Sequence, residues 1–492
     1  MRTQKIRIFL LAALLCLGFA GCDTAEPPAE TILTTDIVET TTIPEETLDI
    51  PLTADYGGDT FNILSAGNEA YEDFTVDEES SLVLDNARYK VKMRVENDYN
   101  IEIVEDVEKS YSSGNGPGYK AINKQVNSGD CDYDLCLIAG YDVSVLAYNS
   151  YLYDLHSVPG IDLSKSWWDQ NATDSLTVRG VTFFTTGDIT TSDNDTAFVV
   201  IFNKTIADNY GIEDPYQLVY NNEWTLEKFS QLAKQVSEDL NQDGTMDKND
   251  RFGLMVYDDS ICAIVHAAGS RCCTISEDGN IELTIYNENT LAALEDYFSI
   301  AYDTQSAIHY QRVVGSTQEE RQMWKEDHAL FWPTWMGHVP ALREMDSDFG
   351  LLPYPKLYTS QEKYSSMMHP YGSQYICVPL VQDDVERTGV ITEALAYYGQ
   401  KITLPAYYDV NLVGQSTRDE ESEDMLDIIF DSIVYDIGYC YQIGPYNKQL
   451  IYMSREYDTN FTSRYESYLP ASERMLGIIN KYYSAAVDEW KK

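Results

Sequence analysis

Residues 239–250 carry the side chains of this sequence that are best suited to bind a metal ion. Oxygen-bearing side chains stand at positions 1, 3, 5, 9 and 12 of this stretch, and Gly244 stands at position 6. Hard Ca²⁺ takes roughly six to eight oxygen ligands, and alternating side chains converge only where the backbone turns sharply at a permissive residue. This spacing is that of an EF-hand-type calcium loop. The expected ligands, with Thr245 binding through its carbonyl, are Asp239, Asn241, Asp243, Thr245, Asp247 and Asp250.

Two features depart from an EF-hand. Asp250 stands where a bidentate Glu is usual, and the residues after the loop, 252–257, have the composition of a strand and not of a helix. The alternative is a solvated acidic turn without a metal. The functional interpretation is a structural calcium site that fixes a surface loop.

Catalytic motifs are not found in the sequence. It contains no HExxH, no GxSxG and no catalytic Cys/His motif, and its six histidines are scattered. With 80 acidic residues, chance carboxylate pairs are inevitable, so a glycoside hydrolase stays open as an alternative. We expect that the protein is not an enzyme.

The elements around the acidic loop follow from hydrophobic periodicity. An amphipathic helix over 226–236, with Thr225 as its N-cap, precedes the loop. Over residues 61–138 the pattern alternates strands with helices, which predicts a mostly parallel α/β lobe. We expect strands at 61–64, 101–104, 133–138, 197–204, 252–257 and 375–379, and further apolar stretches stand at 329–336 and 349–356. We expect helices at 82–98, 120–127, 289–302, 385–400, 421–434 and 472–489.

Composition limits the class of partner. A chain of 492 residues is too long for one core, so two or more lobes are expected. The formal charge of −46 argues against a nucleic-acid partner. The 38 tyrosines suit surfaces that bind polar ligands, because tyrosine offers a large ring and one polar group at little entropic cost.

The N-terminal sequence is typical of an export signal. Basic residues precede an apolar run over 8–17, which ends in small residues before Cys22. This resembles a bacterial lipoprotein signal, with 1–21 removed and Cys22 acylated. Residues 22–50 are rich in Thr, Glu and Pro and predict a disordered tether. No later run is long and apolar enough to span a membrane, so we expect a lipid-anchored protein on the extracellular face of the cell membrane.

Of the nine cysteines, seven lie after Cys22, and no pair has CxxC spacing. We expect these seven to be small buried hydrophobic residues in a reducing habitat.

Several stretches together resemble the family 1, carbohydrate-type extracellular solute-binding proteins of bacterial ABC importers. They occur in the expected order and cover most of residues 55–480. Besides the lipoprotein signal and tether, they are 164–169 (SKSWWD), 202–204 (FNK), 223–225 (EWT), the acidic loop 239–250, 349–356 (FGLLPYPK) and 404–408 (LPAYY).

The resemblance implies an α/β fold, that of a two-lobed, periplasmic-binding-protein-like (type II) protein with a hinge and an interlobe cleft. Lobe one would comprise 51–190 plus 372–405, and lobe two 191–371 plus 406–492. The chain would cross between the lobes near 190–198, 367–372 and 405–412. Closure about the hinge would trap the ligand, because only the closed form lets both lobes touch it.

A sugar presents hydroxyl groups and apolar C–H faces, so its site needs aromatic rings and planar hydrogen-bonding groups. Trp332 and Trp335 are the first candidates, with core packing as the alternative. Tyr141 and Asp142 follow a buried strand, where open α/β sheets bind ligands. The remaining candidates are Asp193 and Asp195 at the first crossing and Trp168, for which a solvated turn and a packed corner are the alternatives.

The sequence therefore predicts a monomeric, lipid-anchored binding protein that delivers a carbohydrate, specifically an oligosaccharide, to an ABC permease. The alternatives are a surface-anchored carbohydrate-active hydrolase and a calcium-dependent adhesion or sensory module.

Overall fold

The computed structural model describes residues 46–110, 113–342, 345–412 and 420–490. The predicted signal peptide, Cys22 and most of the predicted tether lie outside these residues. Contacts between Cα atoms divide the chain into 1–47 and one compact unit, Leu48–Lys492. Among the described helices, none combines the length and apolarity needed to cross a membrane.

The first sheet contains the parallel strands β1 (Asp59–Gly67), β2 (Ile101–Lys109) and β3 (Leu135–Ala139). Its strand order is β13-β3-β1-β2, and β13 (Gln374–Cys377) pairs antiparallel with β3. The predicted mostly parallel sheet is therefore confirmed. The side chains of β3 are buried along its whole length, as expected for a sheet covered on both faces.

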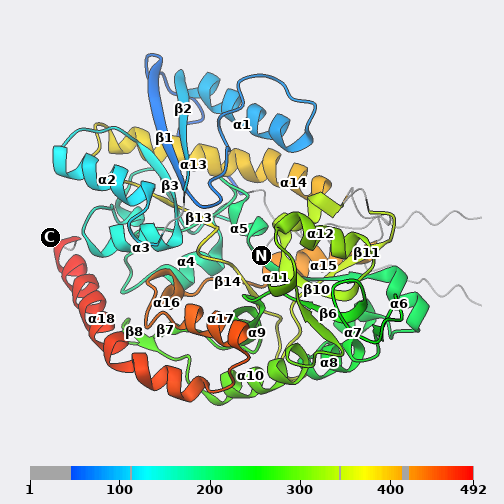
Figure 1. Cartoon of the computed structure of the whole chain (residues 1–492). Coiled ribbons are helices and arrows are strands. Elements are labelled where there is room, and N and C mark those ends of the chain that lie inside the picture. The colour runs from blue at the N-terminus through cyan, green and yellow to red at the C-terminus, as the bar shows by residue number, and fades with distance from the viewer. Residues whose placement is uncertain (1–45, 111–112, 343–344, 413–419, 491–492) are drawn as a thin grey trace, which may run out of the picture. The chain divides into compact units, whose positions relative to one another are not determined.

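Helices join and cover the first sheet. The strands are connected through α1 (Val83–Tyr99) and α2 (Pro117–Ser128), and α3 (Gly140–Tyr148) follows β3 directly. From a distant part of the sequence, α13 (Val385–Tyr398) contacts α1 (Figure 1). Segments more than 200 residues apart in the sequence thus share this part of the fold.

The second sheet has the order β11-β4-β10-β6-β5, with β9 paired to β6 off this path. The strands are β4 (Phe198–Asn203), β5 (Ser237–Glu238), β6 (Arg251–Val256), β9 (Ala307–His309), β10 (Ala329–Trp335) and β11 (Phe349–Leu352). Because β10 and β9 both run parallel to β6, the carboxyl ends of these three strands meet at one edge of the sheet. That edge matters for the site described below.

Two chain segments that join the parts carrying the two sheets run side by side. One passes through α5 (Ser192–Asp195) into β4, and the other passes from β12 (Ser366–Met367) into β13. Ala197 and Met368 form an antiparallel bridge, and the amide of His369 donates to the carbonyl of Thr196 at 3.2 Å. The two segments lie where the resemblance implies the first two crossings, although the predicted lobe boundaries stay a prediction.

The remaining helices surround these sheets (Figure 1). They are η1 (Leu155–Ser157), α4 (Gln170–Leu176), α6 (Lys204–Tyr210), α7 (Pro215–Tyr220), α8 (Leu226–Ala233), α9 (Ser260–Ala267), α10 (Glu288–Ala301), α11 (Tyr310–Val313), α12 (Thr317–Lys325), η2 (Met336–Leu342), η3 (Gly399–Thr403), α14 (Leu404–Leu412), α15 (Glu420–Asp431), α16 (Ile437–Cys440), α17 (Tyr446–Glu456) and α18 (Phe461–Trp490). Small pairs form from β7 (Cys273–Ile275) with β8 (Ile281–Leu283) and from β12 with β14 (Ile433–Val434).

Each helix that sequence periodicity predicted is present, and Thr225 caps α8 as predicted by accepting from the amide of Lys228 at 3.3 Å. The last helix begins eleven residues before the predicted position 472, at Phe461, and contains Pro470. Proline breaks a helix only where its missing amide and its ring conflict with the preceding turn, and here the chain continues past it.

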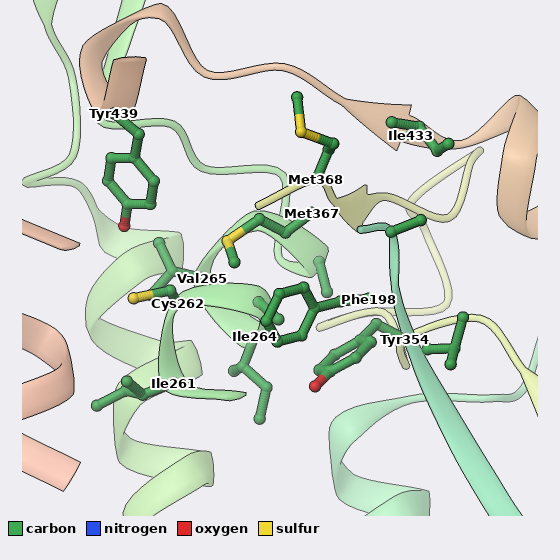
Figure 2. Packing of buried hydrophobic residues seen from close by; sticks show 14 of the residues in the cluster. Phe198, Ile261, Cys262, Ile264, Val265, Tyr354, Met367, Met368, Ile433 and Tyr439 are labelled. Carbon is green, nitrogen blue, oxygen red and sulfur yellow. The ribbon is translucent and has the colours of Figure 1, made fainter. Parts of the chain in front are cut away.

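The core of the second sheet is densely aromatic. Figure 2 shows Phe198 beside Ile264 and Tyr354, and the two rings meet edge to face at 6.1 Å between centroids. Nearby, the hydroxyl of Tyr439 points toward the sulfur of Cys262 (Figure 2). These side chains are almost fully buried, so this packing is a large hydrophobic contribution to stability.

In the described part of the chain, the seven cysteines are free thiols. Cys136 on β3 lies directly opposite Cys377 on β13. Cys131 is the one partly exposed thiol of the seven, and the others are buried, as the sequence predicted.

Candidate functional site

The carboxyl ends of the parallel strands in the first sheet present polar and aromatic side chains. Glu69 and Tyr71 follow the end of β1, and Tyr141 follows the end of β3. Ligands of open α/β sheets bind at this edge, because the loops there are free to vary while the sheet holds their bases rigid.

The second sheet supplies a matching set at its own carboxyl edge. Tyr257 and Asp259 follow β6, Tyr310 follows β9, and Trp335 ends β10. The ring of Tyr257 stacks on that of Tyr310 at 5.9 Å and on that of Phe198 at 6.2 Å. The carboxyl ends of three parallel strands therefore place aromatic rings and a carboxylate at one edge of the second sheet.

His369, on the segment between β12 and β13, joins the two sets. Its ring stacks on Trp335 at 5.6 Å with an interplanar angle of 22°, and on Phe198 at 6.0 Å. It also meets the ring of Tyr371 edge-on at 5.3 Å, and Tyr371 lies 6.3 Å from the ring of Tyr141. A continuous series of ring contacts thus runs from the first sheet to the second. We call these residues, with Glu69, Tyr71, Asp195, Tyr257, Asp259 and Tyr310, the aromatic site.

The two sets come together at Gly372. A Cβ atom at this position would lie 3.1 Å from Thr196 Cγ2, 3.2 Å from Trp335 Cζ3 and 3.6 Å from Glu69 Cγ. Glu69 and Trp335, which come from different sheets, therefore reach the same point. The packing here is so close that even a methyl side chain would be crowded against Thr196 and Trp335.

Two carboxylates in the aromatic site have different partners. Asp259 Oδ2 lies 3.4 Å from His369 Nε2. Asp195 accepts a hydrogen bond from the hydroxyl of Tyr407 on α14 at 2.7 Å, and burial raises the pKa of Asp195 to about 6 despite this bond. Asp195 therefore ties the first connecting segment to α14.

The arrangement suits a ligand with both apolar faces and hydroxyl groups. Aromatic rings contact C–H faces, and carboxylates and phenol groups exchange hydrogen bonds with hydroxyls. Two surface hollows of about 380 Å³ lie elsewhere, one against α10 and residues 459–462, the other against α1 and β2. Neither is lined by residues of the aromatic site, so we place the candidate site by its chemistry and by the strand ends.

Three of the predicted ligand residues, Tyr141, Trp335 and Asp195, belong to the aromatic site. Trp332 does not: it is fully buried and stacks on His338 at 5.5 Å, with Trp324 5.6 Å away. Its three-residue distance from Trp335 along a strand turns the two side chains to opposite faces.

Trp168 is also inside the core. Its indole Nε1 donates to Glu393 at 2.9 Å, and Nε1 of the neighbouring Trp167 donates to the same carboxylate at 3.0 Å. Burial raises the pKa of Glu393 to about 7. These contacts hold α13 against the loop that carries the two tryptophans.

The last two predicted residues hold the backbone or a neighbouring side chain. Asp142 accepts from the amides of Gly114 and Gly116 at 2.9 and 3.0 Å, just before α2. Asp193 is buried and accepts from the hydroxyl of Tyr435 at 3.4 Å. Both contacts are structural, and a ligand role for either residue stays a prediction without support from them.

Carboxylates of the acidic loop 239–250 accept hydrogen bonds from backbone amides of the same loop. Asp239 accepts from the amides of Asp243 and Gly244 at 3.3 and 2.8 Å, and Asp250 accepts from those of Leu240 and Asp247 at 2.9 and 2.8 Å. Gly244 has φ +84°, the turn for which the sequence pattern requires glycine. Among the described residues, no group of three or more His, Cys, Asp or Glu side chains is arranged to hold a metal ion. Calcium binding by this loop therefore stays a prediction.

Sequence reasoning missed several members of the aromatic site. The rule that selected Tyr141, a polar residue after a buried strand, applies equally to Tyr257 and Asp259, which follow the strand expected at 252–257. It applies to Glu69 and Tyr71 as well, which follow β1. His369 had no such signal. Its importance comes from the crossing of two distant segments, which a single sequence does not reveal.

No protein-family model and no curated protein sequence matches the chain. Solved structures do match its fold. An ABC substrate-binding protein from Listeria monocytogenes, in complex with cycloalternan, superposes with a TM-score of 0.54 and 14% identity over 86% of this chain and 99% of that one. A family 1 extracellular solute-binding protein from Bifidobacterium longum subsp. infantis gives 0.52 and 12% over 87% and 100%. A sugar transporter from Rhizobium etli in an open conformation gives 0.55 and 12% over 87% and 99%.

At such low sequence identity, the structural similarity establishes the fold and nothing finer. The chain has the two-lobed α/β fold of the maltose-binding-protein-like periplasmic binding proteins, as the sequence predicted. The matched structures are described as solute-binding or transport proteins rather than as enzymes, in agreement with the expectation that this chain is not one.

Proposed function

We propose that this protein captures a carbohydrate in the aromatic site and delivers it to an ABC permease. The observation that carries the proposal is the meeting of Trp335, His369, Tyr371 and Tyr141, which brings rings from both sheets into one series of contacts. A ligand bound there touches both halves of the fold at once. Such a ligand stabilises the arrangement in which the halves are together, and this is the physical basis of capture.

The structural neighbours support the class of ligand. The Listeria protein holds cycloalternan, and another neighbour is complexed with maltotetraose. We propose an oligosaccharide rather than a single sugar, because the series joins several rings from both sheets. The hydrolase and the adhesion module have no comparable support.

Isothermal titration against a panel of neutral oligosaccharides of several linkages and lengths tests the proposal. We expect at least one to bind, with a negative heat-capacity change from the apolar contact of ring and sugar face. Binding of a peptide or of a metal ion, with no sugar bound, would contradict the proposed ligand class.

We further propose that Cys22 is acylated and holds the protein on the outer face of the cell membrane. The support is the basic, apolar and small-residue order of the first 22 residues. Expression of the wild type and a Cys22→Ser variant in a bacterial host, followed by detergent-phase partitioning, distinguishes the outcomes. Equal release of both proteins into the aqueous phase would argue against the anchor.

The acidic loop is proposed as a structural calcium site. Its support is the ligand spacing and the glycine turn at Gly244. We predict that Asp243→Ala removes a calcium-dependent rise in melting temperature, because an ion that binds only the folded state stabilises it by mass action. The control is Glu277→Ala, which removes an exposed carboxylate from the turn between β7 and β8. If wild type melts at the same temperature in calcium and in chelator, the site does not exist.

A further inference from the structure

Carboxylates flank the aromatic site from both sheets. Glu69, which follows β1, is exposed and lies beside Gly372, as Trp335 does. Asp259, which follows β6, faces the same ring series through His369 at 3.4 Å. A ligand that contacts Trp335 would therefore lie near carboxylates from both sheets.

Three cations near the site are paired with acids. Arg88 lies 3.0 Å from Asp73. The same holds for Lys109 with Glu72 at 2.5 Å and for Arg455 with Asp258 at 2.5 Å. The charge of Arg321 lowers the pKa of the buried Glu320, which burial raises to about 7. Arg88, Lys109 and Arg455 therefore each have an acid beside them.

The tyrosines of the site report the sign of the local potential. Burial raises the pKa of Tyr257 well above its usual value, and the charges that raise it further are Asp258, Asp259 and Glu320. Burial likewise raises the pKa of Tyr141, and the charge of Asp259 raises it further. For Tyr71 the neighbouring charges are Asp195, Asp73 and Glu69. Each phenol therefore lies in a field that opposes added negative charge.

We propose that the aromatic site selects glycans that carry no carboxylate, sulfate or phosphate, and that Glu69 and Asp259 are the residues that reject the anionic ones. The inference rests on the proposed carbohydrate function and adds the charge class of the substrate. Rejection follows because an anionic sugar loses its hydration on entering the site and meets carboxylates where it would need a cation. The formal charge of −46 on the whole chain acts in the same direction at longer range.

The test uses the neutral oligosaccharide of the panel that wild type binds most tightly, together with its oxidised counterpart, in which primary hydroxyl groups have become carboxylates. Both are titrated into wild type at low salt. We expect the oxidised glycan to bind at least tenfold more weakly, and the difference to shrink at high salt because screening weakens repulsion.

Variants assign the effect to residues. Glu69→Gln keeps the size of the side chain and a hydrogen-bond acceptor but removes the charge. It should therefore reduce the difference in affinity between the neutral and the oxidised glycan severalfold. Asp259→Asn should do the same, with its melting temperature checked because Asp259 faces His369. Glu102→Gln is the matched control: the same change on an exposed residue at the start of β2, the end of the sheet away from the site.

The outcomes separate the two proposals. Equal or tighter binding of the oxidised glycan by wild type overturns the charge selection while leaving carbohydrate capture intact. The charge selection is also overturned if the difference in affinity between the neutral and the oxidised glycan is as large in Glu69→Gln and Asp259→Asn as in Glu102→Gln. The responsible charge would then lie elsewhere. If neither form of any glycan binds, the proposed function fails and this inference fails with it.

Discussion

The molecule contains two pairs of tryptophans close together in the sequence, and the pairs are used differently. Trp167 and Trp168 are both buried, and both indole N–H groups donate to one carboxylate, Glu393. Trp332 and Trp335 diverge, with Trp332 buried and Trp335 partly exposed beside His369. Within the described part of the chain, neither Trp332 Nε1 nor Trp335 Nε1 has a hydrogen-bond partner.

The difference shows what separates a structural aromatic residue from a candidate binding residue. A buried indole N–H without a partner is unfavourable, and the first pair avoids this cost through Glu393. Trp332 and Trp335 both leave this N–H unpaired among the described residues, so exposure is what separates them. Trp332 is enclosed, whereas Trp335 is partly open beside His369.

The largest effect that we predict separates the second pair. Trp332→Ala should reduce the free energy of unfolding by about 3–5 kcal/mol, because it empties a fully enclosed indole site between Trp324 and His338. Trp335→Ala, at a partly exposed position, should cost far less. Denaturant unfolding of both variants measures the difference, and similar losses for the two would remove the distinction between them.

A second prediction concerns how stability depends on pH through Glu393, the partner of Trp167 and Trp168. Burial raises the pKa of Glu393 from its usual 4.5 to about 7 in the folded state. The folded protein therefore binds more protons than the unfolded chain in this range, so the stability that Glu393 contributes is greatest below pH 4.5 and declines as the pH rises toward 7. The decline amounts to roughly 3 kcal/mol at most.

Glu393→Gln removes the titrating group while keeping a hydrogen-bond acceptor for the indoles. The slope of stability against pH should therefore be shallower in this variant than in wild type between about pH 5 and 7. Glu386→Gln, an exposed change on the same helix, should leave the slope as it is. An identical slope in Glu393→Gln would assign the pH dependence to other buried acids, such as Glu105 and Glu320.

The smallest effect is on affinity. Trp335→Ala should weaken binding of the preferred oligosaccharide by roughly 1–3 kcal/mol, the range for loss of an aromatic contact at the centre of a binding site. The sequence made Trp332 an equal candidate for ligand contact, whereas its packing predicts lost stability instead. Calorimetry at a temperature where both variants are folded decides between them. Full affinity in Trp335→Ala would show that its ring is not a contact surface.

Local pattern was enough to predict most of the fold. The strands 133–138 and 197–204 could be recognised because a short, continuous apolar run is typical of a strand that is buried on both faces. The cap at Thr225 followed from side-chain chemistry and a short spacing. Such features depend on neighbours along the chain.

The site was predictable only in part, for a physical reason. Tyr141 and Trp335 are at strand ends, where sequence order and spatial position coincide. Glu69, His369 and Gly372 meet because β1 and the segment before β13 come together across about 300 residues of chain, and no local periodicity encodes that meeting. The period-two alternation of a strand would have separated Trp332 from Trp335, since residues three apart point to opposite faces.

Cys131 gives this protein a practical property. It lies just before β3, and among the thiols of the described chain it alone is partly open to solvent, while Cys136, Cys377 and the others are enclosed. A maleimide dye added to a soluble form lacking the first 47 residues should attach mainly at this one sulfur. Motion of the two halves could then be followed by fluorescence without first removing any native cysteine.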